Sequence, residues 1–119
     1  MFAPAHKVDN LIAAIDYNRK QIDGSTDDVM PLGDLRAKWQ TFGWEVLEMN
    51  GNDMAEIINI MDRAKKLTGR NVPVMVIMKT EMGMGVDFMT GTHIWHGVPP
   101  NDEQLAMALS QLEETIGDY

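Results

Sequence analysis

Oxygen-bearing side chains gather in the segment DYNRKQIDG, which directly follows the apolar run LIAAI. Asp16, Asn18 and Asp23 offer carboxylate and amide oxygens, and the backbone carbonyls of the segment offer more. A hard cation such as Mg²⁺ prefers oxygen ligands of these kinds. Asp and Asn also shape turns through hydrogen bonds to nearby backbone, and spacing alone favours a turn over a metal site.

A second segment with candidate ligand-binding residues follows the apolar run VPVMVIM. These residues are Lys79, Gly83, Gly85, His93 and His96. A Gly-x-Gly pattern lets backbone approach a ligand closely, but here no helix follows at once and the third glycine of a dinucleotide-binding loop is missing. The two histidines suit a zinc pair in spacing, yet the sequence has no cysteine and no clear third ligand. A lysine and a histidine in such a loop favour contact with an anionic or polar substrate, and two surface histidines without a ligand are an equal alternative.

The elements that would position both segments alternate between strand and helix. We expect strands at 11–16, 44–48 and 74–79, and helices at 32–42, 53–67 and 102–116. This order predicts an α/β fold with a three-stranded parallel sheet and helices on its faces. The apolar run of the first strand indicates a strand covered on both faces, and the third strand, apolar throughout, should be central. Ligands bind outside the carboxyl ends of parallel strands, so both segments should open at the same end of the sheet.

Apolar residues recur at helical spacing in two of the expected helices. The first helix presents Leu32, Leu35, Trp39 and Phe42 on one face. The second presents Met54, Ile57, Ile58, Met61, Ala64 and Leu67. Capping boxes are expected where an Asp or Asn precedes a Glu or Gln by three residues, at Asp53 with Glu56 and at Asn101 with Gln104.

Composition excludes several classes of protein. The chain has 119 residues, of which 45% are apolar and 24% charged, which is enough for one small globular domain. Its net charge of -8 disfavours binding to nucleic acid and to anionic membranes. No apolar run is long enough to span a bilayer, and the first residues lack the apolar core of a signal peptide. Without cysteine, disulfides and thiolate chemistry are excluded, and a cytoplasmic location is expected.

Several stretches together resemble one protein family. The segments DNLIAAIDYNRKQIDG, MPLGDLRAKWQTFGWEVLEMNGNDM, VIMKTEMGMGV and WHGVPPNDEQL resemble the amino-terminal, diphosphate-binding domain of transketolase. The nearest form is similar to the bacterial and archaeal split type, in which this domain is a separate polypeptide. The resemblance extends from about residue 2 to about residue 112, and the order of the motifs makes it specific.

The resemblance implies thiamine diphosphate and Mg²⁺ as cofactors. By position, Asn18 matches the residue whose side-chain oxygen binds Mg²⁺, and Lys20 matches the one that gives a backbone carbonyl to the same ion. Ile22 matches an apolar residue that packs against the cofactor. Lys79 and His96 match residues that line the cofactor and substrate channel, and His96 is the candidate catalytic residue. The implied reaction is transfer of a two-carbon ketol unit between sugar phosphates, as in the pentose phosphate pathway.

The chain also departs from the family pattern. It lacks the family's Gly-Asp-Gly motif, whose Asp is a further Mg²⁺ ligand, and the domain that supplies the Glu activating the aminopyrimidine. We therefore expect residues 1–119 to be a partial diphosphate-binding domain that lacks the Gly-Asp-Gly half. Alone it should be inactive, and it should associate with complementary transketolase polypeptides or with itself. The alternatives are a truncated or degenerate, non-catalytic transketolase-like domain acting through protein contacts, and a fragment of another thiamine diphosphate enzyme.

Overall fold

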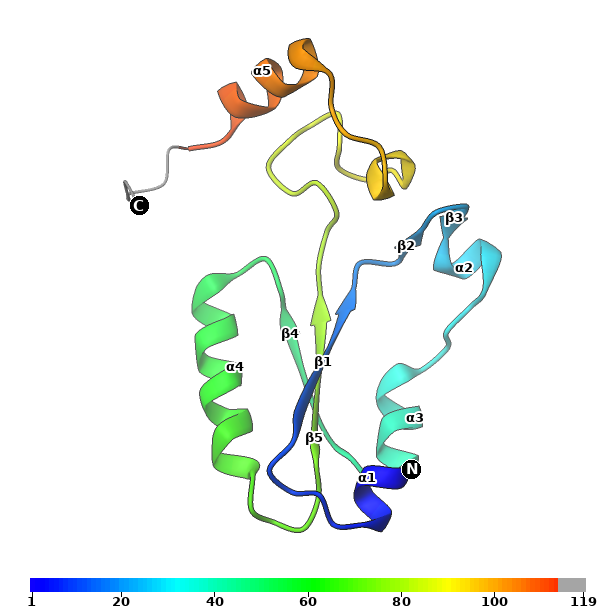
Figure 1. Ribbon diagram of the computed structural model, residues 1–119, viewed down its shortest axis with the longest axis vertical. Helices are drawn as coiled ribbons and strands as arrows, with labels where there is room; N and C mark the ends of the chain where they lie inside the picture. Colours follow the sequence, from blue (N-terminus) through cyan, green and yellow to red (C-terminus); the bar gives the residue numbers. More distant parts are fainter. Residues whose placement is uncertain (114–119) are drawn as a thin grey trace.

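The sheet has the predicted parallel arrangement. The computed structural model describes residues 1–113. Three parallel strands lie in the order β1-β5-β4 (Figure 1), so the last strand in sequence is central, as expected. Their bounds are Ile12–Tyr17 for β1, Glu45–Asn50 for β4 and Val74–Lys79 for β5.

Helices cover both faces of this sheet. Helix α4, Met54–Leu67, packs on one face, and helix α3, Leu35–Thr41, packs on the other (Figure 1). The core on the α4 face consists of buried Leu47, Met49, Ala64, Val74 and Val76. The core on the α3 face consists of buried Val46, Met75 and Ile77, with Trp39 and Trp44 packed against them. Because β5 is central, its side chains contribute to both cores, and its first four residues are buried.

Strand β1 is less covered than predicted. Ala14 and Asp16 are exposed, and the other four residues of β1 are only half-buried. Within residues 1–113, β1 is therefore not covered on both faces. Both helices pack mainly over the other strands, and β1 pairs only with β5 among the strands of residues 1–113.

Helix starts follow their capping residues. Asp34 caps α3 by accepting a hydrogen bond from the Ala37 N–H at 2.8 Å, so this helix begins three residues later than predicted. Asp53 caps α4 by accepting from the N–H groups of Ala55 and Glu56. Helix α5, Asp102–Gln111, has the predicted capping box, while the expected end at 116 lies outside the described residues. None of the helices in the described part of the chain is long and apolar enough to cross a bilayer.

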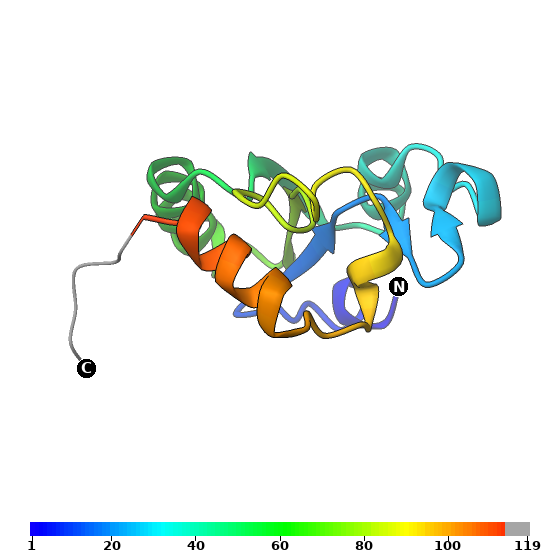
Figure 2. The ribbon, with the colours of Figure 1, turned by 90° about the horizontal axis from the view of Figure 1, so that it is seen from above.

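Small elements missed by the sequence analysis lie mostly beyond the carboxyl ends of the strands. A two-residue hairpin and a one-turn helix follow β1, and a 3-10 turn precedes α5; both groups sit at the same end of the sheet (Figures 1 and 2). These elements are β2 (Lys20–Gln21), β3 (Gly24–Ser25), α2 (Thr26–Val29) and η1 (Ile94–His96), and a further short helix, α1 (Phe2–Ala5), lies at the amino terminus.

Candidate functional site

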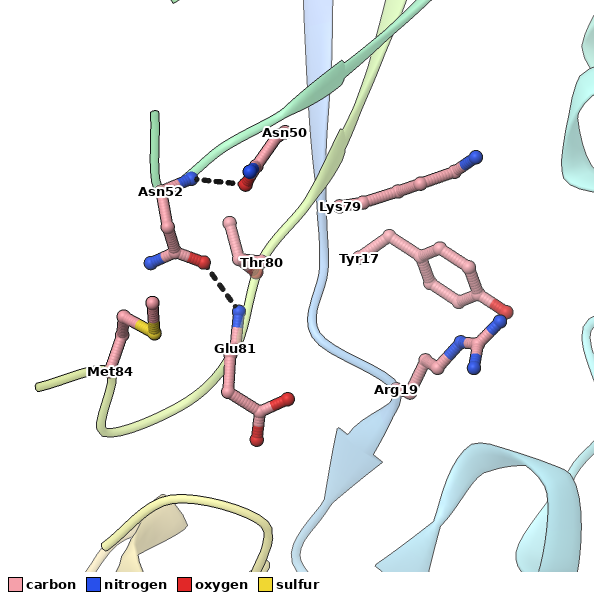
Figure 3. A pocket seen from close by; sticks show the side chains of 8 residues that line it. All are labelled: Tyr17, Arg19, Asn50, Asn52, Lys79, Thr80, Glu81 and Met84. Carbon is pink, nitrogen blue, oxygen red and sulfur yellow. Dashed lines mark hydrogen bonds between the residues drawn. The ribbon is translucent and has the colours of Figure 1, made fainter. Parts of the chain in front are cut away.

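Two clefts open at the carboxyl ends of the strands. The larger encloses about 320 Å³ and is lined by Tyr17, Arg19, Asn50, Asn52, Lys79, Thr80, Glu81 and Met84 (Figure 3). The smaller encloses about 220 Å³ and is lined by Tyr17, Arg19, Gly33, Asp34, Leu35, Arg36, Glu48, Ile77 and Lys79. Tyr17, Arg19 and Lys79 line both, so they form a wall that the clefts share. This is the place in the fold where ligands of parallel sheets bind.

An ion-pair network lies in this shared wall. Lys79 Nζ lies 2.5 Å from Glu48 Oε2, and Arg36 Nη1 lies 3.2 Å from Glu48 Oε1. Hydrogen bonding to the Lys79 ammonium lowers the pKa of Glu48; partial burial opposes this shift, and the Arg36 guanidinium adds to it. Glu48 therefore stays ionised at neutral pH and holds two cations that come from different elements.

The predicted Asn18 turn is present. Asn18 Oδ1 accepts a hydrogen bond from the Lys20 N–H at 2.8 Å, which is the turn geometry that the sequence favoured over a metal site. The Lys20 side chain then reaches the second segment, where its Nζ donates to the Gly91 carbonyl at 3.1 Å. The two segments thus meet at one end of the sheet, which confirms their predicted common edge.

The other predicted site residues lie outside both clefts. Ile22 is 73% exposed. His96 is exposed in η1, and its N–H donates to the His93 carbonyl at 3.0 Å, while His93 is half-buried. Of the predicted residues, the structure places only Lys79 in a cleft wall.

Oxygen ligands for a metal are present but few. Asp16 accepts a hydrogen bond from the Thr80 hydroxyl, and Asp23 is exposed. Within residues 1–113, no three His, Cys, Asp or Glu side chains converge into a metal site. The Asn18 amide oxygen and the Lys20 carbonyl suit Mg²⁺ in kind, but Mg²⁺ requires near-octahedral coordination. The chain by itself therefore fits only part of a Mg²⁺ site.

Gly83 allows close packing within the second segment. Its φ of +72° disfavours any residue with a side chain, and a Cβ there would lie 2.5 Å from the Met89 Cβ. The glycine therefore lets the second segment fold closely on itself.

Two cleft residues at the carboxyl end of β4 were missed: Asn50, the last residue of the strand, and Asn52, in the turn that follows it. Asn52 Oδ1 accepts a hydrogen bond from the Glu81 N–H at 2.7 Å, and Asn50 Oδ1 accepts from the Asn52 N–H at 3.0 Å (Figure 3). The first bond joins the turn after β4 to the segment after β5, and the second shapes the turn itself. The available signal was the polar run NGND directly after a predicted strand.

Comparison with known proteins identifies the fold and the family. Residues 1–114 match the family model of the transketolase thiamine diphosphate-binding domain. The chain is 43% identical over 111 residues to one of the subunits of the apulose-4-phosphate transketolase of Phocaeicola vulgatus, covering 93% of this chain and 39% of the relative. It is 37% identical over 114 residues to SqwG, a 6-deoxy-6-sulfo-D-fructose transketolase subunit of a Clostridium species, covering 96% and 41%.

Solved structures agree with the sequence comparison. The transketolase of Campylobacter jejuni superposes with a TM-score of 0.82 at 31% identity, covering 92% of this chain and 17% of that one. The transketolase of Leishmania mexicana superposes with a TM-score of 0.81 at 27% identity, covering 92% and 16%. The chain spans about two fifths of the length of the subunit-type relatives. The match over nearly the whole chain shows that it belongs to the transketolase family, as a thiamine diphosphate-binding domain.

Proposed function

We propose that this chain contributes part of the thiamine diphosphate and Mg²⁺ site of a transketolase assembled from more than one polypeptide. The observation that carries the proposal is the meeting of the Asn18 and His96 segments at the carboxyl ends of the strands, joined by the contact between Lys20 and Gly91. The same end of the sheet holds Lys79 in the wall of both clefts. The reaction would be transfer of a two-carbon ketol unit between sugar phosphates.

The proposal assigns a role to each matched residue. The Asn18 amide oxygen and the Lys20 carbonyl would hold Mg²⁺, with the remaining positions taken by diphosphate, water and other protein ligands. Ile22, exposed in this chain, would pack against the cofactor or against a complementary polypeptide. Lys79 would bind an anionic group, and His96 would contact the substrate. Thiamine diphosphate, when bound, supplies the electron sink for carbon–carbon bond cleavage next to a ketone.

The names of two relatives support the proposal of complementary polypeptides. Two relatives are named as transketolase subunits, and this chain spans about two fifths of each. We therefore propose that parts of the transketolase outside these 119 residues supply the further metal ligand and the Glu that activates the cofactor, and that residues 1–119 alone are inactive. The assembled enzyme would work in the cytoplasm on sugar phosphates, as in the pentose phosphate pathway.

Calorimetric titration of thiamine diphosphate tests this proposal. The chain should bind weakly alone, because each missing charge-assisted contact is worth about 1.5–3 kcal/mol. With its complementary polypeptides it should bind more tightly, and only with Mg²⁺. Asn18→Ala should weaken this Mg²⁺-dependent binding, whereas the control Asn59→Ala, at an exposed helical position, should not.

The same titration separates the alternatives. If the chain binds its partners but the complex takes up no thiamine diphosphate, a non-catalytic domain acting through protein contacts replaces the proposal. Low micromolar binding by the chain alone would show that its own residues complete the site.

A further inference from the structure

The Glu48 carboxylate contacts two cations at once, whereas a simple surface ion pair needs only one. Its two carboxylate oxygens each contact a different cation, Lys79 from the end of β5 and Arg36 from α3. The Glu48 side chain is 27% exposed, whereas the Lys79 side chain is 61% exposed. The carboxylate is thus the more fixed partner, and the lysine is the one that reaches solvent.

The sheet register makes this contact possible. Glu48 of β4 lies opposite Ile77 of β5, and Lys79 follows two residues later on the same face of the sheet. Glu48 and Lys79 are therefore diagonal neighbours on a rigid parallel pair of strands, a distance that long side chains reach. A position on a strand holds a side chain more precisely than a position on a loop.

Lys79 keeps capacity for a ligand while it is held. An ammonium group has three N–H donors, and the contact with Glu48 uses one of them. Both clefts are lined by Lys79, but only the smaller is lined by Glu48. Glu48 thus contacts the ammonium on the side of the smaller cleft, and the Lys79 side chain, which is 61% exposed, also lines the larger cleft.

We propose that Glu48 is a positioning residue that holds the Lys79 ammonium in the wall shared by the two clefts, ready for the diphosphate or phosphate group of a ligand. This inference rests on the proposed function, in which Lys79 binds an anion. An unheld lysine would have to be immobilised by the anion itself. Because Glu48 already immobilises the Lys79 side chain in the folded protein, ligand binding does not have to offset that loss of conformational entropy.

Simple electrostatics predicts the opposite effect, which makes the inference testable. Removing a carboxylate next to an anion site should tighten anion binding if Glu48 acts only through its charge. Removing it should weaken binding if Glu48 positions Lys79. The isosteric Glu48→Gln and the shorter, still charged Glu48→Asp separate the two effects, because Asp keeps the charge but loses the reach.

The experiment is a titration of the full chain with inorganic pyrophosphate, followed by NMR signals of Lys79. Both Glu48→Gln and Glu48→Asp should weaken binding about two- to tenfold, the range expected for immobilising one long side chain. The control Glu45→Gln, at an exposed position of the same strand, should have no effect. In a Lys79→Met background, the Glu48 substitutions should change nothing further. If the amide spectrum shows that Glu48→Gln does not fold, the pyrophosphate affinity of Glu48→Asp tests the positioning role instead.

The outcomes separate this inference from the proposed function. Unchanged or tighter pyrophosphate binding by the Glu48 variants would overturn the positioning role and leave the proposed function standing. A wild-type chain whose Lys79 signals do not respond to pyrophosphate would overturn the inference as well. In that case the proposed function would still be decided by thiamine diphosphate binding in the assembled complex.

Discussion

Strand β1 should drive association of the chain, and a single lysine should prevent it. One edge of β1 pairs with β5, and no strand in residues 1–113 pairs with the other. Ala14 lies in the middle of this strand and is exposed. We expect the unmodified chain to self-associate or to bind a complementary polypeptide through this edge, and Ala14→Lys to weaken that association.

A comparison of free energies shows whether backbone hydrogen bonds alone could drive this association. Alternate residues of the six-residue edge offer roughly six backbone groups, whose hydrogen bonds would contribute about 3–9 kcal/mol. Association costs about 4–15 kcal/mol, so hydrogen bonds alone do not suffice. The chain exposes 8367 Å², whereas a compact monomer of 13.4 kDa exposes about 6,500 Å². The excess, on the order of 1,000–2,000 Å², is comparable to one partner's share of an obligate interface, and burial of apolar side chains within such an interface would have to supply the remainder.

Sedimentation velocity measures the association, and hydrogen exchange locates it. Ala14→Lys should weaken association at least about tenfold, equivalent to about 1.4 kcal/mol, because an ammonium in a strand interface lacks a partner. Ala55→Lys adds the same charge at an exposed position of α4 and should leave association unchanged. A strictly monomeric chain with slow exchange along β1 and a cooperative melt would refute the reasoning, because the edge would then be satisfied internally.

Three further outcomes are expected. Gly83→Ala should lower the free energy of unfolding, measured in urea, by about 1–3 kcal/mol more than Gly69→Ala does. Both glycines have a positive φ, but of the two only Gly83 has a neighbour, Met89, that an added Cβ would meet. Equal losses of stability in the two variants would contradict this reasoning. Because its cationic partners lower the pKa of Glu48, its contribution to stability is present above its ordinary pKa and is lost as the pH falls through the lowered one. Glu48→Gln should therefore flatten the acid limb of a stability–pH curve, and an unchanged limb would speak against the ion pairs. In a reconstituted enzyme, His96→Ala should lower turnover more than cofactor affinity, and normal kinetics would remove His96 from the site.

Features set by local sequence were predicted well. The bounds of β5 agree with the prediction, because an apolar run bounded by Pro73 and a lysine specifies a buried strand. The capping box of α5 was predicted because both of its hydrogen bonds join residues three apart. The common edge of the two segments followed from parallel topology, which the alternation of strands and helices implies.

Features set by packing between distant segments were not predicted. The pairing of Glu48 with Lys79 depends on the register between β4 and β5, which no local pattern contains. The burial of both faces of β1 was inferred from its own apolar residues, but burial depends on which other elements pack against the strand. The close packing of Gly83 against Met89 was not predicted either. In each case the deciding contact lies outside the pattern that suggested the residue.

The two hypotheses for Asn18 are compatible in the structure. Its Oδ1 accepts a hydrogen bond from the Lys20 N–H at 2.8 Å, as a turn requires. An amide oxygen has two lone pairs, so this bond leaves one for a cation. The same bond fixes the orientation of the amide and brings the Lys20 backbone beside it, and the Lys20 carbonyl is the second Mg²⁺ ligand that we propose. The turn would therefore preorganise both oxygen ligands, and the proposed metal contact needs the local geometry that first argued against it.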